Sequence, residues 1–139
     1  MKRKITGLLL LTLSALLINT AAALNIREPF LCASIQVNEC IDGRSCDPVL
    51  AEDVNAPTFF RVDVKDREIE VYRNAPPSKV LAQTEVEGRL VLSGAEDGND
   101  QQPDGTGWTL SIEQDTGRFV LAATVLQGAI VVFGACTEI

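Results

Sequence analysis

Residues 58–73 read TFFRVDVKDREIEVYR and contain two segments of alternating apolar and charged residues. Phe60, Val62 and Val64 alternate with charged side chains, and the same alternation returns after a short polar turn. A period of two places the apolar side chains on one face of a β-strand and the charged side chains on the other. Residues 58–73 therefore predict an antiparallel hairpin with one buried and one solvated face.

Similar patterns recur along most of the chain. Alternation or short β-branched runs occupy eight segments: 30–37, 58–64, 68–73, 79–87, 90–93, 108–113, 119–126 and 129–136. Short connectors between them favour antiparallel neighbours. Asp47-Pro48 is typical of a helix start, so one short helical turn is predicted at 48–53. We expect an all-β fold, an antiparallel meander of about eight strands closed into a barrel or barrel-like sandwich.

An export signal is predicted at residues 1–23. Basic residues at 2–4 precede an apolar run at 5–18, and three alanines end with Ala23. This order is typical of a signal peptide that is cleaved after the alanines. A retained membrane anchor is the alternative, because the apolar part approaches the roughly 20 residues that span a bilayer. Cleavage fits the alanine triplet better and leaves one domain at 24–139, located in the periplasm or secreted.

Four cysteines follow the signal, at Cys32, Cys40, Cys46 and Cys136. An even number of cysteines behind an export signal predicts disulfides, and four cysteines allow three pairings. The Asp-Gly between Cys40 and Cys46 favours a local bridge, which leaves Cys32 to pair with Cys136. Metal binding by the thiolates is the alternative, but the chain has no C-x-x-C pair. We therefore expect two disulfides, no metal site and no cofactor.

The net charge limits the classes of partner. The signal holds three of the 12 Lys and Arg and none of the 19 Asp and Glu, so residues 24–139 carry a formal charge of −10. This charge repels nucleic acid and anionic lipid and attracts a cationic protein or peptide. Acidic residues also keep exported proteins soluble, which is the alternative explanation. We expect no nucleic-acid partner, no membrane contact after cleavage, and a monomer.

Catalytic motifs are scarce. The chain has no histidine, which excludes His-dependent nucleophile triads and imidazole metal ligands. Asp115-Thr116-Gly117 matches the D-T-G triplet of aspartic proteases, but the triplet occurs once. A hairpin turn with Gly117 at positive φ explains the same three residues. We expect that the protein is not an enzyme.

Two groups of residues are candidates for binding. The polar segment 95–107 forms a candidate binding loop through the oxygens of Asp97, Asn99, Asp100 and Asp104. Such oxygens suit Ca²⁺ or a cationic partner, although their spacing does not match the EF-hand pattern. The second group lines a candidate barrel cavity from alternate positions of one strand: Trp108, Leu110 and Ile112.

Three short segments lie in the C-terminal third: Gly107-Trp108-Thr109-Leu110-Ser111-Ile112, Thr116-Gly117-Arg118-Phe119 and Phe133-Gly134-Ala135-Cys136-Thr137. This part resembles small exported bacterial proteins of uncharacterised function. The resemblance covers about 30 residues; it implies a periplasmic or secreted β domain and no activity. Small exported lysozyme inhibitors of Gram-negative bacteria are similar in size, export signal and disulfide-closed barrel plan. Their serine-rich inhibitory loop has no counterpart here, so this likeness is one of architecture.

Together these patterns predict an exported, non-enzymatic binding module that recognises a cationic protein or peptide, in the manner of an inhibitor. The alternative is a small-molecule carrier, because an eight-stranded barrel either fills its interior or holds one ligand. A cavity larger than a few water molecules would favour the carrier, and a filled interior would favour surface recognition.

Overall fold

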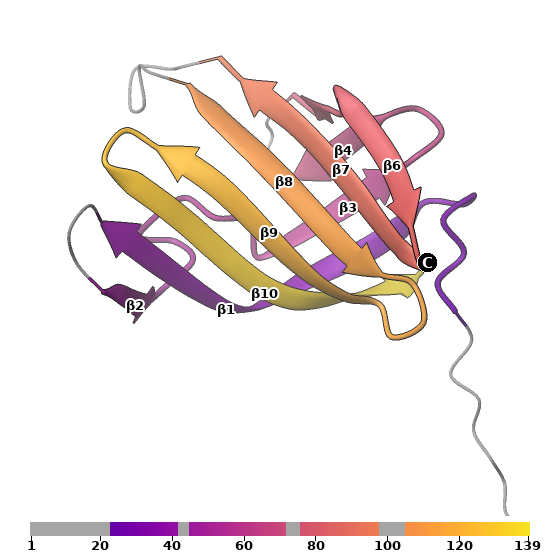
Figure 1. Cartoon of the computed structure of the whole chain (residues 1–139), viewed down its shortest axis with the longest axis horizontal. Helices are drawn as coiled ribbons and strands as arrows, with labels where there is room; N and C mark the ends of the chain where they lie inside the picture. Colours follow the sequence, from indigo (N-terminus) through magenta and orange to yellow (C-terminus); the bar gives the residue numbers. More distant parts are fainter. Residues whose placement is uncertain (1–22, 42–44, 72–75, 98–104) are drawn as a thin grey trace, which may run out of the picture.

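The computed structural model describes residues 23–41, 45–71, 76–97 and 105–139, which contain ten strands and no helix (Figure 1). The strands are β1 (Phe30–Ile41), β2 (Cys46–Val49), β3 (Phe59–Asp63), β4 (Glu68–Val71), β5 (Ser78–Lys79), β6 (Ala82–Val86), β7 (Arg89–Glu96), β8 (Thr106–Glu113), β9 (Arg118–Val125) and β10 (Gly128–Glu138). Within these ranges, no helix is present that could cross a membrane. The chain is all-β, as its alternation predicts.

The strands form one antiparallel sheet that curls into a half-barrel. Its order is β5-β4-β3-β1-β10-β9-β8-β7-β6, and β2 pairs with β1 outside this order. Figure 1 shows β6 to β10 as a front layer, with β3 and β4 behind it. Short turns join the neighbouring pairs β3–β4, β6–β7, β8–β9 and β9–β10. At the β6–β7 turn, Glu87 and Gly88 have φ values of 48° and 77°, the positive values that a two-residue hairpin turn favours.

The first and last long strands lie side by side at the centre of the sheet order. β1 and β10 pair from Phe30 opposite Glu138 to Ile41 opposite Gly128. Cys32 lies directly opposite Cys136, and a disulfide joins them. The second disulfide joins Cys40 to Cys46 and links β1 to β2. Both predicted bridges are present.

The two edges of the sheet, β5 and β6, are consecutive in the chain and are separated by Val80 and Leu81. The Val80 N–H donates to the carbonyl of Arg67 at 2.9 Å, and the Leu81 N–H donates to that of Ser93 at 2.8 Å. Among the described strands, β5 pairs only with β4, and β6 pairs only with β7. The sheet is therefore a half-barrel whose edges are joined by the chain, and the predicted closed barrel is not confirmed.

The helical turn predicted at 48–53 is not confirmed either. Pro48 and Val49 belong to β2 and pair with β1. Residues 51–55 form turns instead of a helix. The Cys40–Cys46 disulfide holds β2 against β1, so the strand ladder uses backbone groups that a helix would have needed.

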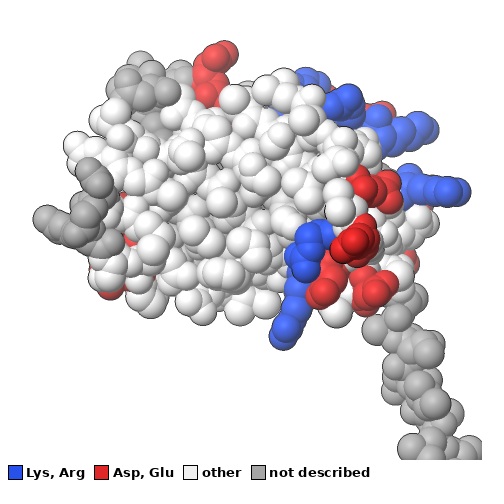
Figure 2. Space-filling model, viewed as in Figure 1, with Lys and Arg blue, Asp and Glu red and all other residues white. Residues whose placement is uncertain are grey.

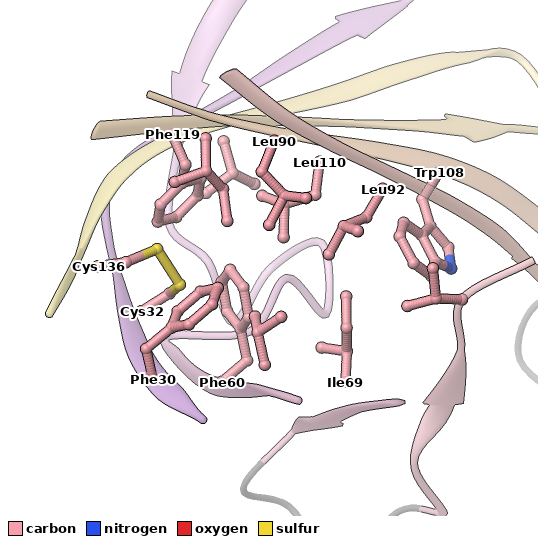
Figure 3. Packing of buried hydrophobic residues seen from close by; sticks show 14 of the residues in the cluster. Phe30, Cys32, Phe60, Ile69, Leu90, Leu92, Trp108, Leu110, Phe119 and Cys136 are labelled. Carbon is pink, nitrogen blue, oxygen red and sulfur yellow. A yellow bond between two sulfur atoms is a disulfide. The ribbon is translucent and has the colours of Figure 1, made fainter. Parts of the chain in front are cut away.

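The inward-facing side chains form one hydrophobic core between the layers (Figure 3). Phe60 and Val62 of the predicted hairpin are buried, as are Leu90 and Leu92. The rings of Phe60 and Phe119 meet edge to face, with centroids 5.3 Å apart. In the described part of the chain, no polar or charged residue is fully buried.

Candidate functional site

The interior of the half-barrel has two ends, one at each end of the strands. We call the end near the β6–β7 and β8–β9 turns the closed end. There the N-terminal segment 24–29 packs across the strand ends, and Leu24 is buried with its N–H donating to the carbonyl of Gln114 at 2.7 Å. The opposite end, near the β9–β10 turn, is the open end. Figure 3 shows Trp108 far from the Cys32–Cys136 disulfide, which lies at the closed end.

A pocket of about 300 Å³ occupies the interior at the open end. Its front wall comes from β8, β9 and β10, and its rear wall comes from β3, β4 and residues 54–57. Phe60 lines the pocket and also contacts Phe119, so it separates the pocket from the packed closed end. Since a water molecule occupies about 30 Å³ in the liquid, the pocket is larger than a few waters.

Small inward-facing side chains contribute to the space at the open end, although the Trp108 indole also lies there. Ala123 and Val125 of β9 face it, and Ala56 faces it from the other side. At the closed end, the same sheet carries the larger rings of Phe30 and Phe119. The curl of the sheet keeps its layers apart, so alanine and valine leave space that phenylalanine would fill.

Trp108 forms the most specific part of the pocket wall. It lies opposite Ala123 on β9 and Gly94 on β7, and only 8% of its surface is exposed. A Cβ atom at Gly94 would overlap the Trp108 indole and the backbone carbonyl of Lys79. Because Gly94 has no side chain, the indole of Trp108 has room to lie directly against the backbone of β7.

The indole Nε1 of Trp108 is buried and has no hydrogen-bond partner, the one side-chain N or O atom of this kind found among the described residues. Buried polar groups in folded proteins are almost always paired. Leaving such a donor without a partner costs about 1–3 kcal/mol. The described residues thus leave one buried donor unpaired beside the pocket, and its surface is closed to solvent.

Polar groups occur at the mouth of the pocket. The Ser78 hydroxyl donates a hydrogen bond to the Glu96 carboxylate, and both residues line the pocket together with Thr106. The described lining residues include no Lys and no Arg. The pocket thus has a mostly apolar body and an acidic residue at its rim.

The residues predicted to line a cavity separate in the structure. Trp108 and Leu110 line the pocket. Ile112 faces the same interior but is fully buried near the closed end, opposite Leu90 and Phe119. The sequence reasoning missed Ala123 and Ile130, which line the pocket from β9 and β10.

The candidate acidic loop is mostly outside the described residues, as are Asn99, Asp100 and Asp104. Asp97 is described and exposed, directly after Glu96 at the pocket mouth. Over the described ranges, no group of three or more His, Cys, Asp or Glu could hold a metal ion. For this loop, the expectation of no metal site stays a prediction.

The D-T-G triplet forms the turn between β8 and β9. Gly117 has a φ of 69°, as predicted for a hairpin turn, and its N–H donates to the carbonyl of Glu113 at 2.8 Å. Asp115 is exposed there. The Thr116 hydroxyl makes the local side-chain bond, donating to the Glu113 carboxylate at 2.7 Å.

The outer face of the front layer is uncharged over a wide area (Figure 2). The uncharged outward positions on β8, β9 and β10 include Thr109, Ser111, Val120, Ala122, Thr124, Val131 and Phe133, whereas the outward Glu113 and Arg118 lie near the closed end. In this view, the Lys and Arg side chains gather toward the closed end. The open end therefore presents a less charged surface on this face.

A second hollow, of about 580 Å³, lies at the closed end between the N-terminal segment and β6. Arg27, Lys65 and Glu85 line it, and all three are exposed. This hollow is wider than the interior pocket, but it is shallow and open to solvent. The interior pocket is the stronger candidate because buried core residues, among them Phe60, Leu110 and Val132, line it.

Comparison of the chain with protein-family models, with curated proteins and with solved structures finds no match. The functional argument therefore rests on the pocket and its side chains.

Proposed function

We propose that the protein is an exported, non-catalytic carrier that binds one small, largely apolar molecule in the interior pocket. The observation that carries this proposal is the space of about 300 Å³ at the open end, in a core whose other end is densely filled. Natural binding sites for small molecules are concave, mostly apolar and furnished with few polar groups. The pocket has each of these properties.

Burial of apolar surface supplies the affinity in this proposal. Each square ångström of apolar ligand surface removed from water contributes about 25 cal/mol. The half-barrel is held by strand ladders and two disulfides, so little of this free energy is lost in ordering the protein. A pre-formed pocket of this size suits a ligand at the small end of the range seen in proteins.

The two disulfides support the export of the protein. Two disulfides are compatible with a periplasmic or extracellular protein, where such bridges persist. Recognition of a cationic protein or peptide stays a prediction, because most of its candidate loop lies outside the described residues. The pocket favours the carrier over this alternative.

The proposal is tested by titrating the protein with N-phenyl-1-naphthylamine, a neutral apolar fluorophore. We expect saturable binding with one site per chain. In Ala123→Leu, the added side chain enters the pocket, and we expect binding to weaken at least tenfold.

Ala122→Leu is the matched control. Ala122 precedes Ala123 on β9 but points to the outer face and is exposed. The same added volume should leave the affinity unchanged there. Equal weakening in both variants, or no saturable binding to the wild type, would overturn the carrier proposal.

A further inference from the structure

We propose that the outer edge of β6 is a docking site for an extended, acidic peptide segment of a partner protein, which adds to the sheet as one more strand. The inference is independent of the carrier function, because it concerns the hollow at the closed end and not the interior pocket. It is carried by an unpaired strand edge that lies beside a hollow of about 580 Å³ with two cations in its wall.

The free edge of β6 follows from its pairing with β7. The two-residue turn 87–88 makes Val86 and Arg89 a hydrogen-bonded pair. Such pairs alternate with pairs that exchange no hydrogen bond, so the N–H and C=O groups of Gln83 and Glu85 point away from β7. Figure 1 shows β6 as the last strand of the front layer. No other described strand pairs with β6, and no described residue bonds to these backbone groups.

The edge of β6 is also poorly protected against the addition of a strand. Proteins commonly block such edges with proline or lysine. The short strand β2, which pairs only with β1 among the described strands, carries Pro48. All five residues of β6 are exposed, and none of them is proline or lysine. The backbone groups of β6 are therefore accessible to a further strand, the recognition mode known as β-augmentation.

The hollow of about 580 Å³ lies beside this edge. Gln83 and Glu85, the residues with free backbone groups, are the β6 residues that line it. The wall also contains apolar side chains that pack on the core: Leu24, Ile26 and Val64. A hollow that is open to solvent suits an extended chain, which has to enter and leave it. The apolar part of the wall can receive the alternate side chains of such a strand.

The charge of the hollow selects the kind of peptide. Arg27 and Lys65 are exposed in its wall, and neither makes an ion pair with a described residue. Glu85 is the acidic residue of the described wall, and its carboxylate accepts a hydrogen bond from the Gln114 amide at 3.4 Å. The described wall thus has more positive than negative groups, although the chain is acidic overall. An acidic side chain on the added strand would be attracted to the two cations, and a basic one would be repelled.

Three capped peptides test the inference with the wild-type protein: acetyl-TVEVT-amide and two relatives with glutamine or lysine at the central position. The peptides differ only in the central side chain. We expect the glutamate peptide to bind about threefold more tightly than the glutamine peptide, and the lysine peptide to bind most weakly. Equal binding of all three peptides, or no binding of the glutamate peptide at millimolar concentration, would overturn the inference.

Amide hydrogen exchange in the wild type locates the bound peptide. The N–H groups of Gln83 and Glu85 are free, whereas the N–H of Thr84 bonds to β7. Saturation with the glutamate peptide should slow exchange at Gln83 and Glu85 about tenfold and leave exchange at Thr84 nearly unchanged. Unchanged exchange at Gln83 and Glu85 would mean that the peptide binds elsewhere, which would also overturn the inference.

Gln83→Pro tests the role of the backbone. Proline removes the outward N–H, and the hydrogen bonds of β6 to β7 do not use that group. We expect the glutamate peptide to bind this variant about tenfold more weakly. Gln83→Ala is the matched control, because it shortens the same side chain but keeps the N–H, and it should bind almost as the wild type does. Equal affinities of the two variants would contradict strand addition.

Lys65→Glu tests the role of charge without altering the strand edge. It should abolish the preference for the glutamate peptide over the glutamine peptide. Arg118→Glu makes a similar charge reversal at an exposed residue outside the hollow and should keep the preference. A preference that survives Lys65→Glu, or one that both variants lose, would contradict the proposed wall.

A second copy of the chain is the alternative occupant of this edge. Sedimentation of the wild type without peptide distinguishes the two occupants. We expect a monomer, whose β6 edge is free for the peptide. A dimer that Gln83→Pro dissociates would assign the edge to a second copy and would overturn the inference.

Discussion

The closed end and the open end of the interior are built from the same strands but from different side chains. At the closed end, Phe30 and Phe119 pack beside the buried Cys32–Cys136 disulfide, and Leu24 covers the strand ends. At the open end, Ala123 and Val125 leave a pocket. The comparison indicates that one end supplies stability and the other supplies space, so substitutions should act differently at the two ends.

The largest expected effect is removal of the disulfide at the closed end. Cys32→Ala with Cys136→Ala opens a loop with a sequence separation of 104. In the loop-entropy model, this costs about 4–5 kcal/mol of unfolding free energy. Urea denaturation of the double variant, compared with the wild type, measures it. A loss of unfolding free energy below about 1 kcal/mol would contradict the claim that the closed end supplies most of the stability.

Two leucines provide the most direct comparison of the ends. Leu90→Ala removes a side chain that is fully buried against the closed end and should cost about 3 kcal/mol. Leu121→Ala makes the same change at a partly buried residue of the pocket wall and should cost about 1 kcal/mol, because its side chain already borders empty space. The midpoints of urea denaturation give both values. Equal losses would show that the two ends are packed alike.

The disulfide at the open end should matter less than the one at the closed end. Cys40 and Cys46 are six positions apart, and Cys46 is exposed. Replacing both by alanine should cost about 2 kcal/mol in the same model. Urea denaturation of this double variant and of the Cys32/Cys136 double variant, under the same conditions, compares the contributions of the two disulfides to the unfolding free energy. A larger loss here than at the closed end would reverse the comparison.

The smallest expected effect is that of filling the pocket. Ala123→Leu should change the unfolding free energy by less than about 1 kcal/mol, since the added atoms enter existing space rather than a packed core. Denaturation curves of this variant and of Ala122→Leu should nearly coincide. A loss of about 3 kcal/mol would mean that the pocket wall has no room and would argue against the proposed site.

The sequence predicts the strands and the disulfides well because both depend on local or simple signals. Alternation around Phe60 and around Leu90 has a period that only a strand satisfies, and both residues are buried. The Asp-Gly pair in the sequence between Cys40 and Cys46 favours their local bridge, which leaves Cys136 as the partner of Cys32, and both bridges are present. These features do not depend on how distant strands are arranged.

The arrangement of the strands and the pocket could not be predicted in the same way. A closed meander would place its seam between the first and last strands, but β1 and β10 pair in the middle of the sheet, and its edges lie at β5 and β6. The pocket depends on small or absent side chains, at Ala123 and Gly94. Such residues add nothing to the hydrophobic periodicity from which strands are predicted. The unpaired nitrogen of Trp108 is visible only when every neighbour is known.

The pairing of Cys32 with Cys136 has a mechanical consequence. A pulling force applied at the two ends of the chain passes from β1 to β10 through one covalent bond, so it does not act on the residues between them. At about 3.3–3.6 Å per extended residue, the bridge keeps roughly 350 Å of chain from being drawn out. The domain should therefore transmit tension between its ends without unfolding, for as long as the bridge stays oxidised.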